Sequence, residues 1–150
     1  MPQRLLRPLS TNALGDKTSF IDKNGATWRY DYDRQGRLFN QYSPPVLVKL
    51  SKETAPTNRS LQTRLSYDAF GSLVERIEAA FTVDQRITKY VYDRLGRQIA
   101  MVQPGWYDPA IGRVEASSAA GRFQRSLATT YDALGNQVHT KLQTGINSYR

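Results

Sequence analysis

Three groups of side chains in this sequence are of types that could perform chemistry or bind a ligand, and the first is a single histidine. His139 is the one candidate for a general base. Hydrolytic triads need a nucleophile and an orienting acid beside the histidine, and the spacing around His139 gives no evidence of either. We therefore expect His139 to be a surface residue of a strand, and we predict no catalytic residue and no enzymatic activity.

The second group consists of aspartates that recur in one sequence setting and could bind a hard cation through their carboxylate oxygens. They are Asp22, Asp33, Asp68, Asp93 and Asp132. Each is the one acid of its segment and several have arginine neighbours, so a structural turn is favoured over a metal site. Neither a dinucleotide-binding nor a Walker glycine pattern occurs, and the chain has no cysteine. We predict neither a metal nor a cofactor.

The third group comprises aromatic side chains that alternate with basic ones, in Trp28-Arg29-Tyr30 and Lys89-Tyr90-Val91-Tyr92. Rings beside cations could stack on bases or sugars, so Trp28, Tyr30 and Tyr90 are candidate ligand contacts, with glycans as the ligand class. Packing of one hairpin on the next would explain the tyrosines equally well. The net charge of +8 could attract nucleic acid, but the basic residues are scattered without a run. Nucleic acid is therefore an unlikely partner.

One phrase, Tyr-Asp-x-x-Gly, occurs four times along the chain, with 35, 25 and 39 residues between successive tyrosines. The copies comprise Tyr32, Asp33 and Gly36; Tyr67, Asp68 and Gly71; Tyr92, Asp93 and Gly96; and Tyr131, Asp132 and Gly135. Two shorter echoes precede them, with Asn12 and Gly15 in one and Asp22 and Gly25 in the other. The extra length between copies falls at residues 43–60 and 103–126, whose prolines predict long loops.

The order of residues in this phrase predicts a hairpin turn. The Asp or Asn side chain can accept hydrogen bonds from backbone N–H groups two or three residues on, and the next two residues fit a type I turn. The glycine then supplies the left-handed conformation that closes a three-residue hairpin loop, where a Cβ would be costly. Each copy is therefore expected to reverse the chain between two strands.

The residues on either side of each turn show the period of two that is typical of strands. Tyrosine always precedes the turn Asp, and the third residue after the glycine is always apolar: Phe39, Val74, Ile99 and Val138. The segment 73–81 also fits an amphipathic helix, since Ser72 and Glu75 resemble a capping box and Leu73, Ile77 and Phe81 follow a helical stripe. Its place in the repeat favours a strand.

The four phrases resemble the YD repeats of the Rhs family, which includes bacterial Rhs polymorphic toxins, shell-forming components of insecticidal toxin complexes, and animal teneurins. The resemblance implies an all-β fold, in which consecutive YD-repeat β-hairpins form an extended, curved antiparallel sheet, a fragment of a hollow β-shell. It also implies a non-enzymatic structural role. The implied partners are the remainder of the shell and an enclosed toxin polypeptide.

One departure from the family pattern lies between the last two repeats. The phrase from Tyr107 to Arg113 resembles a segment near the end of Rhs shells, but the self-cleaving aspartate motif expected after it is missing. No catalytic residue is therefore carried over from the family. The chain fits a fragment, a truncated orphan copy or one piece of a split shell. We expect an N-terminal extension over 1–10, the hairpin array over 11–142 and a C-terminal tail over 143–150.

The chain shows neither a signal-peptide core nor an apolar run of membrane-spanning length. We expect a secreted or cell-surface location in the parent context, with a cytoplasmic stage before a non-Sec export route. Isolated hairpins are marginally stable and open sheet edges attract other strands, so self-association is expected. The alternative function is a carbohydrate- or cell-surface-binding module that uses exposed Tyr, Trp and Arg on the repeat sheet.

Overall fold

The computed structural model describes residues 8–103, 106–108, 113–115 and 125–144, and every regular element in these residues is a strand. The strands are β1 (Pro8–Thr11), β2 (Lys17–Ile21), β3 (Thr27–Tyr32), β4 (Leu38–Tyr42), β5 (Val46–Val48), β6 (Thr57–Arg59), β7 (Gln62–Tyr67), β8 (Leu73–Glu78), β9 (Arg86–Tyr92), β10 (Gln98–Val102), β11 (Trp106–Asp108), β12 (Arg113–Glu115), β13 (Arg125–Tyr131) and β14 (Gln137–Thr144). The predicted all-β class is confirmed. No helix in the described part of the chain is long and apolar enough to cross a membrane.

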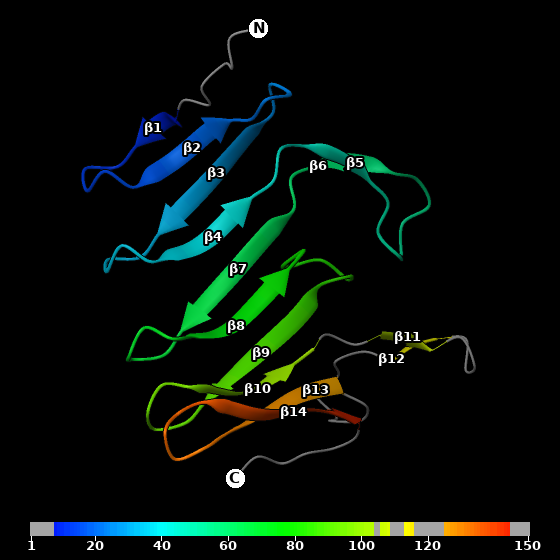
Figure 1. Ribbon diagram of the computed structural model, residues 1–150. Helices are drawn as coiled ribbons and strands as arrows, with labels where there is room; N and C mark the ends of the chain where they lie inside the picture. Colours follow the sequence, from blue (N-terminus) through cyan, green and yellow to red (C-terminus); the bar gives the residue numbers. More distant parts are fainter. Residues whose placement is uncertain (1–7, 104–105, 109–112, 116–124, 145–150) are drawn as a thin grey trace, which may run out of the picture. The chain divides into compact units, whose positions relative to one another are not determined.

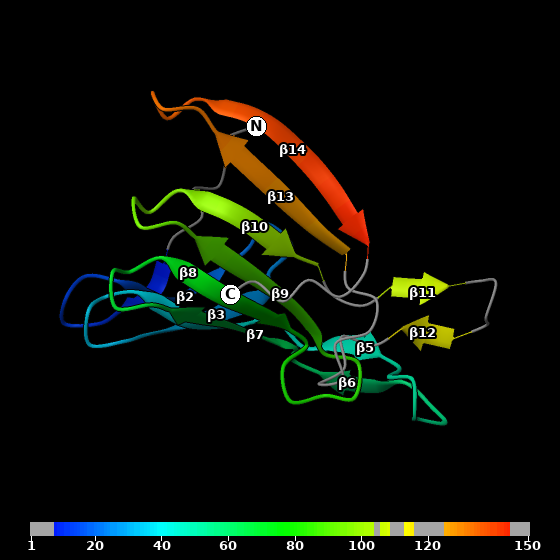
Figure 2. The same ribbon diagram turned by 90° about the horizontal axis from the view of Figure 1, so that it is seen from below.

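Ten of the strands form one antiparallel sheet in the order β1-β2-β3-β4-β7-β8-β9-β10-β13-β14 (Figure 1). Strands that follow one another in sequence are neighbours in the sheet, except at two places. Between β4 and β7 the chain forms the separate β5–β6 hairpin, and between β10 and β13 it forms the β11–β12 hairpin (Figure 2). The predicted array of consecutive hairpins is therefore confirmed.

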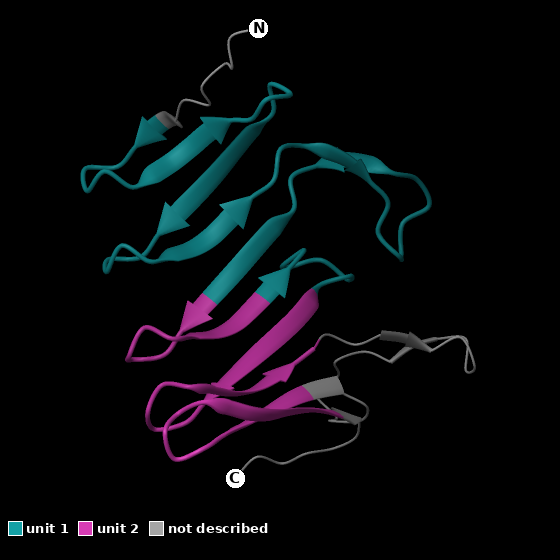
Figure 3. Cartoon of the chain, in the orientation of Figure 1, with its two compact units in different colours: residues 1–65, 77–85 teal, residues 66–76, 86–150 magenta. Residues whose placement is uncertain are grey.

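The chain divides into two compact units (Figure 3). The first consists of Met1–Leu65 and Ile77–Gln85, and the second of Ser66–Arg76 and Arg86–Arg150. The first unit holds the β1 to β4 meander and the β5–β6 hairpin. The second holds the β9–β10 and β13–β14 hairpins, the latter with seven paired positions from Arg125↔Thr144 to Tyr131↔Gln137.

A β-bulge follows the turn in three of the hairpins, always at the apolar residue three places after the glycine. In β9–β10 the register passes from Tyr92↔Gln98 to Val91↔Ala100, which leaves Ile99 without a partner across the strand. Phe39 in β3–β4 and Val138 in β13–β14 are skipped in the same way. Because an extra residue changes which face the following side chains occupy, the strict alternation assumed from the sequence breaks at this position.

The segment that also fits a helix is a strand up to Glu78. It ends in a tight loop in which Ala79 and Phe81 have φ values of 49° and 63°, a region that bulky residues rarely adopt. The Ala80 N–H donates to the Gln62 carbonyl over 2.8 Å, and the Thr82 hydroxyl donates to the Ala79 carbonyl. These bonds join the loop to β7 and close it on itself, and Ala80 is buried within it.

The segments expected to be long loops, 43–60 and 103–126, each contain a two-stranded sheet. At the base of the first, the Ser43 N–H donates to the Leu61 carbonyl and the Leu61 N–H donates to the Ser43 hydroxyl, each over 2.9 Å. The side chain of Glu53 accepts hydrogen bonds from the Leu50 N–H and from Arg59. Local pairing thus forms short strands within segments that prolines had marked as loops.

Strand boundaries differ from the expected domain limits at both ends, since β1 begins at Pro8 within the expected extension and β14 continues to Thr144 within the expected tail. Few side chains are buried. Among the hydrophobic residues that the structure describes, only Leu50, Ala80 and Ala100 are buried. The described residues therefore form little interior, because sheets bury apolar residues mainly against a packed neighbour.

Candidate functional site: the repeat turns

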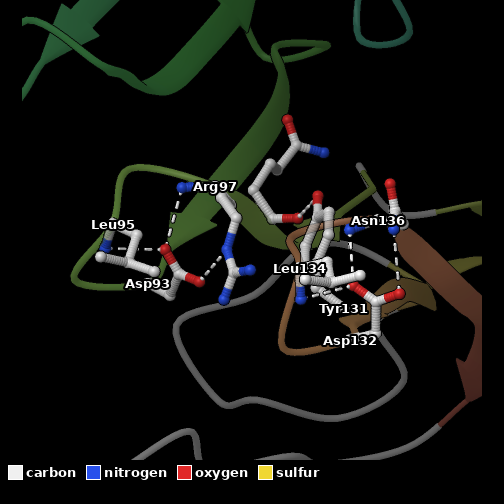
Figure 4. A network of polar contacts seen from close by, with 8 residues as sticks. Asp93, Leu95, Arg97, Tyr131, Asp132, Leu134 and Asn136 are labelled. Atoms are coloured by element: carbon white, nitrogen blue, oxygen red, sulfur yellow. Dashed lines mark hydrogen bonds and ion pairs between the residues drawn. The ribbon is translucent and has the colours of Figure 1, made fainter.

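The turn at Asp93 shows how each repeat reverses the chain (Figure 4). The Asp93 Oδ1 atom accepts hydrogen bonds from the N–H groups of Leu95 and Arg97, both over 2.9 Å. The Gly96 N–H donates to the Asp93 carbonyl over 3.0 Å, and the Asp93 N–H donates to the Arg97 carbonyl over 2.9 Å. Gly96 has a φ of 76°, the left-handed conformation that glycine adopts without a steric cost.

The Oδ1 atom of Asp93 therefore accepts from N–H groups two and four residues on, where the sequence predicted two or three. The third N–H belongs to the glycine, and it is directed at the backbone carbonyl of the aspartate instead. The same pattern recurs at Asp33, which accepts from Gln35 and Arg37, and at Asp68, which accepts from Phe70 and Ser72. It is a property of the type I turn with its bulged glycine. At Asp132 the N–H of Gly135, three residues on, also lowers the carboxyl pKa.

The second carboxylate oxygen has a different donor in different turns. In two turns it is the arginine after the glycine: Arg37 Nε donates to Asp33 and Arg97 Nε donates to Asp93, each over 2.7 Å. In the last turn, the Asn136 amide donates to Asp132 over 3.0 Å. Asp22 accepts from Trp28 Nε1 over 3.2 Å. Each of these carboxylates is used inside its own hairpin.

The first turn exchanges the roles of these two positions. Asn12 stands in the aspartate position, and its Oδ1 atom accepts from the N–H groups of Leu14 and Asp16. Its Nδ2 atom donates over 2.9 Å to Asp16, which stands in the place of the arginine. The interchange keeps both the backbone bonds and the side-chain bond, so Asn12 and Gly15 make the same turn as Asp22 and Gly25.

The hydrogen bonds at the turns lower the pKa of the aspartates. For Asp33 the largest cause is the backbone N–H of Arg37, and for Asp93 it is that of Arg97, with a further lowering from the guanidinium of the same arginine. For Asp22 it is the Ala26 N–H, and for Asp132 it is the Asn136 amide. These donors favour the carboxylate over the carboxylic acid. A charged aspartate is therefore part of the folded turn at neutral pH.

The tyrosine before the aspartate connects one hairpin to the preceding one. The hydroxyl of Tyr131 donates to the Gln98 carbonyl over 2.8 Å, that of Tyr92 to the Leu73 carbonyl over 2.9 Å, and that of Tyr32 to the Lys17 carbonyl over 3.0 Å. In all three the acceptor lies two residues after the glycine of the preceding hairpin. Tyr67 is the last residue of β7, in the equivalent position.

Two further features of the surroundings affect these tyrosines. Burial raises the pKa of Tyr32 and of Tyr92, so each hydroxyl keeps its proton and remains a donor. The Arg97 guanidinium lies 4.7 Å from the centre of the Tyr131 ring (Figure 4), which is within the range of a cation–π contact. Arg97 thus binds Asp93 of its own turn and covers the tyrosine of the next.

Two of the candidate ligand contacts lie together in the first unit, around Phe20. The Trp28 and Tyr30 rings lie 6.4 and 6.0 Å from the Phe20 ring, with interplanar angles of 11° and 12°. The Lys17 ammonium lies 4.4 Å from the centre of the Phe20 ring and 4.9 Å from that of Tyr30. These rings therefore pack on one another and on a cation. Tyr90 is a half-buried residue of β9, opposite Met101.

A polar network in the first unit was missed by the sequence analysis. Asn40 is buried, with an exposed fraction of 8%, and its amide nitrogen donates to Asp31 over 3.1 Å. The Tyr42 hydroxyl donates to the same carboxylate oxygen over 2.9 Å, and Gln62 donates to the Asn40 oxygen over 2.8 Å. The sequence signal was the pair Asp31 and Asn40, polar where the later repeat has Val91 and Ala100.

Among the described residues, no three His, Cys, Asp or Glu side chains lie close enough to hold a metal ion. His139 lies on β14, where it is exposed and its backbone carbonyl accepts a hydrogen bond from the Thr130 hydroxyl over 3.5 Å. The turn aspartates are engaged in the hydrogen bonds that reverse the chain. What the site can do is join one hairpin to the next.

The sequence matches no protein-family model and no curated protein. The structure is similar to solved toxin complexes. A crystal structure of TcdB2-TccC3-Cdc42 matches 88% of this chain, with a TM-score of 0.58 and 21% identity. The Photorhabdus luminescens Tc holotoxin pore with a mutation in TccC3 matches 89%, with a TM-score of 0.58 and 21% identity. TcdB2-TccC3-TEV matches 87%, with a TM-score of 0.57 and 21% identity.

The chain shares its fold with part of a Tc toxin complex. It spans 5% of the length of each matched chain. This likeness supports the resemblance to the Rhs/YD-repeat family that the four Tyr-Asp phrases indicate. In fold, this chain corresponds to a short stretch of each matched chain.

Proposed function

We propose that this chain is a non-enzymatic wall segment of an Rhs-type YD-repeat shell. The observation that carries the proposal is the ten-stranded sheet of Tyr-Asp hairpins. Among the described residues only three hydrophobic side chains are buried, and of these only Ala100 lies in a strand of the sheet. Such a sheet gains little stability from an interior of its own. It gains much from neighbouring strands and from whatever covers its faces.

The turns support the same role. In the second unit, three successive repeat turns place a large apolar residue before the glycine, and Phe70, Leu95 and Leu134 are 96%, 78% and 88% exposed. We infer that these apolar residues at the turn tips contact other parts of the assembly. The partners we propose are the remainder of the shell and an enclosed toxin polypeptide, in a secreted or cell-surface context.

The proposal is tested with the purified chain by sedimentation velocity and by thermal melting followed by circular dichroism. A wall segment is expected to self-associate as concentration rises and to melt at a temperature that depends on concentration. A monomer that melts cooperatively at high temperature, independently of concentration, contradicts the proposal. Mass spectrometry of the same sample after incubation tests the non-enzymatic part, since we expect no self-cleavage.

The second candidate is a glycan-binding module, and the observation that favours it is the cluster of Phe20, Trp28 and Tyr30. Sugars bind to proteins by stacking on open aromatic faces, but here the rings stack on one another and the Lys17 ammonium lies over two of them. The wall is therefore the better supported function. A glycan array separates the two: saturable, sugar-specific binding that Trp28→Ala abolishes would favour the module.

A further inference from the structure

The tyrosine hydrogen bonds lie where two neighbouring hairpins stop pairing. Strands β10 and β13 pair from Val102↔Ser126 to Ala100↔Ala128, and the pairing ends there. The Gln98 carbonyl lies just beyond the last pair and accepts the Tyr131 hydroxyl. A strand carbonyl near a sheet interior needs a partner, and the tyrosine supplies one where the two strands separate toward their turns.

The first unit shows the same arrangement. Strands β2 and β3 pair as far as Ser19↔Arg29, and the Lys17 carbonyl beyond this pair accepts the Tyr32 hydroxyl. In three hairpins the acceptor therefore lies two residues after the glycine, and the next Tyr-Asp hairpin supplies the donor. This relationship predicts what the last strand of the sheet can bind.

Strand β14 offers the same acceptor position at the end of the strand order. Gln137 lies two residues after Gly135, as Gln98 lies two residues after Gly96. Tyr131 pairs with Gln137 as Tyr92 pairs with Gln98, and the bulge follows at the next residue in both hairpins. By this equivalence the Gln137 carbonyl is directed away from β13, toward the outer edge of β14.

Other backbone groups of β14 also face this edge. The Thr129 and Thr140 hydroxyls lie 3.5 Å apart across β13 and β14, which fits the close side chains of a non-hydrogen-bonded pair. The N–H and C=O groups of Thr140, and by alternation those of Leu142, are therefore directed away from β13. Leu142 and Val138 are 52% and 65% exposed, so apolar side chains accompany the edge.

The strand at the other end of the sheet differs. β1 has four residues, begins at Pro8 and shifts register twice against β2. Short length, proline and bulges all discourage the addition of a further strand. β14 has eight residues and no proline. Of the two terminal strands in the described sheet, β14 is the one suited to pairing.

We propose that the outer edge of β14 binds the incoming strand of a further Tyr-Asp hairpin by antiparallel strand addition, with the tyrosine hydroxyl donating to the Gln137 carbonyl. The inference rests on the proposed wall function and names the partner of its open edge. A second copy of the chain does not supply this partner through β1, because Thr11 stands where the tyrosine should be. The occupant is a Tyr-Asp hairpin other than those described.

The test uses the full 150-residue chain and a fluorescent peptide with the sequence of residues 125–136, which contains one incoming strand and its turn. Fluorescence anisotropy gives the affinity. Hydrogen exchange gives the site: the Thr140 and Leu142 amides should gain protection while the neighbouring inward amides change little. A peptide with Tyr131→Phe keeps the ring but lacks the hydroxyl, and it should bind about 3- to 10-fold more weakly.

Thr140→Pro in the full chain is the matched control, since it removes an outward-facing N–H, and proline is tolerated at such positions on an edge strand. It should leave the circular dichroism spectrum unchanged and abolish peptide binding. Equal affinity of the tyrosine and phenylalanine peptides, or protection outside β14, overturns the proposal, and neither result requires a folded variant. Self-association of the chain that Thr140→Pro abolishes would also overturn the proposal, because β14 would then bind a second copy of the chain.

These outcomes are separable from those that concern the wall itself. A chain that self-associates and melts at a concentration-dependent temperature, but binds no peptide, retains the proposed function and loses this inference. A stable monomer that binds the tyrosine peptide at β14 retains the strand-addition site and loses the wall.

Discussion

The hydroxyl of Tyr131 donates to the backbone carbonyl of Gln98, 33 residues earlier in the chain, over 2.8 Å. This bond joins two consecutive hairpins at the point where their pairing ends. It explains why the repeat has tyrosine rather than phenylalanine before the aspartate. A phenylalanine ring could fill the same space, but the carbonyl would lose its donor.

Replacement of Tyr131 by phenylalanine should therefore lower the free energy of unfolding by about 1 kcal/mol, the usual net value of one hydrogen bond. Urea unfolding followed by circular dichroism measures the change. Tyr90→Phe is the matched control, because Tyr90 lies on a neighbouring strand and its hydroxyl forms none of the three tyrosine hydrogen bonds. Equal effects of the two substitutions would show that the hydroxyl–carbonyl bond has no special value.

Substitution of Gly96 tests the backbone requirement of the turn. Gly96 has a φ of 76°, and no atom lies within 4 Å of the position that a Cβ would occupy. Any cost of Gly96→Ala therefore comes from the left-handed backbone, about 1–2 kcal/mol. Gly96→Asn should cost less, because Asn adopts this conformation more readily. The same urea experiment ranks the three proteins, and an alanine variant as stable as the asparagine variant would refute this account.

The sequence predicted the hairpins because their cause is local. Each Asp or Asn, with the glycine three residues later, fixes a turn through hydrogen bonds within five residues. The same locality explains the strand over Leu73–Glu78, where the position in the repeat outweighed a helical pattern. Asn12 was placed correctly in a turn for the same reason, although its bond to Asp16 was not foreseen.

The parts that escaped prediction depend on residues far apart in the sequence. The acceptors of the tyrosine hydroxyls and the partners of Asn40 come from other strands, and they can be named only once the register is known. The bulge at Phe39, Ile99 and Val138 left a signal, an apolar residue in every copy. An apolar residue at this position also fits ordinary strand alternation, so the sequence did not distinguish a bulge from a regular strand.

The turn aspartates predict a loss of stability in acid. Hydrogen bonds from the Arg97 backbone and side chain hold the pKa of Asp93 below its ordinary value of 3.8, and the same holds for Asp33 and Arg37. Because the folded pKa is the lower one, the stabilisation is present above the ordinary value and is lost as the pH falls through the folded pKa. Urea unfolding from pH 7 to pH 2 should show stability decreasing below about pH 4.

Asp93→Asn is the control for this effect. The amide oxygen can still accept the backbone N–H groups, as Asn12 does, but it cannot form an ion pair with Arg97 or titrate. The variant should be less stable than the parent chain at pH 7 and should lose less stability on acidification. An unchanged pH profile would show that Asp93 does not contribute to the acid sensitivity.

The buried Asn40 gives the last prediction. Asn40→Ala leaves Asp31 without its amide donor and Gln62 without its acceptor, and unpaired groups of this kind cost about 1–3 kcal/mol. The later repeat has Val91 and Ala100 in place of Asp31 and Asn40. The double variant Asp31→Val with Asn40→Ala should therefore recover part of the loss, because it also removes the carboxylate that Asn40→Ala leaves without its amide donor. The free energies of unfolding of the two single variants and the double variant test whether Asp31 and Asn40 are coupled. Strictly additive losses would show that they are not.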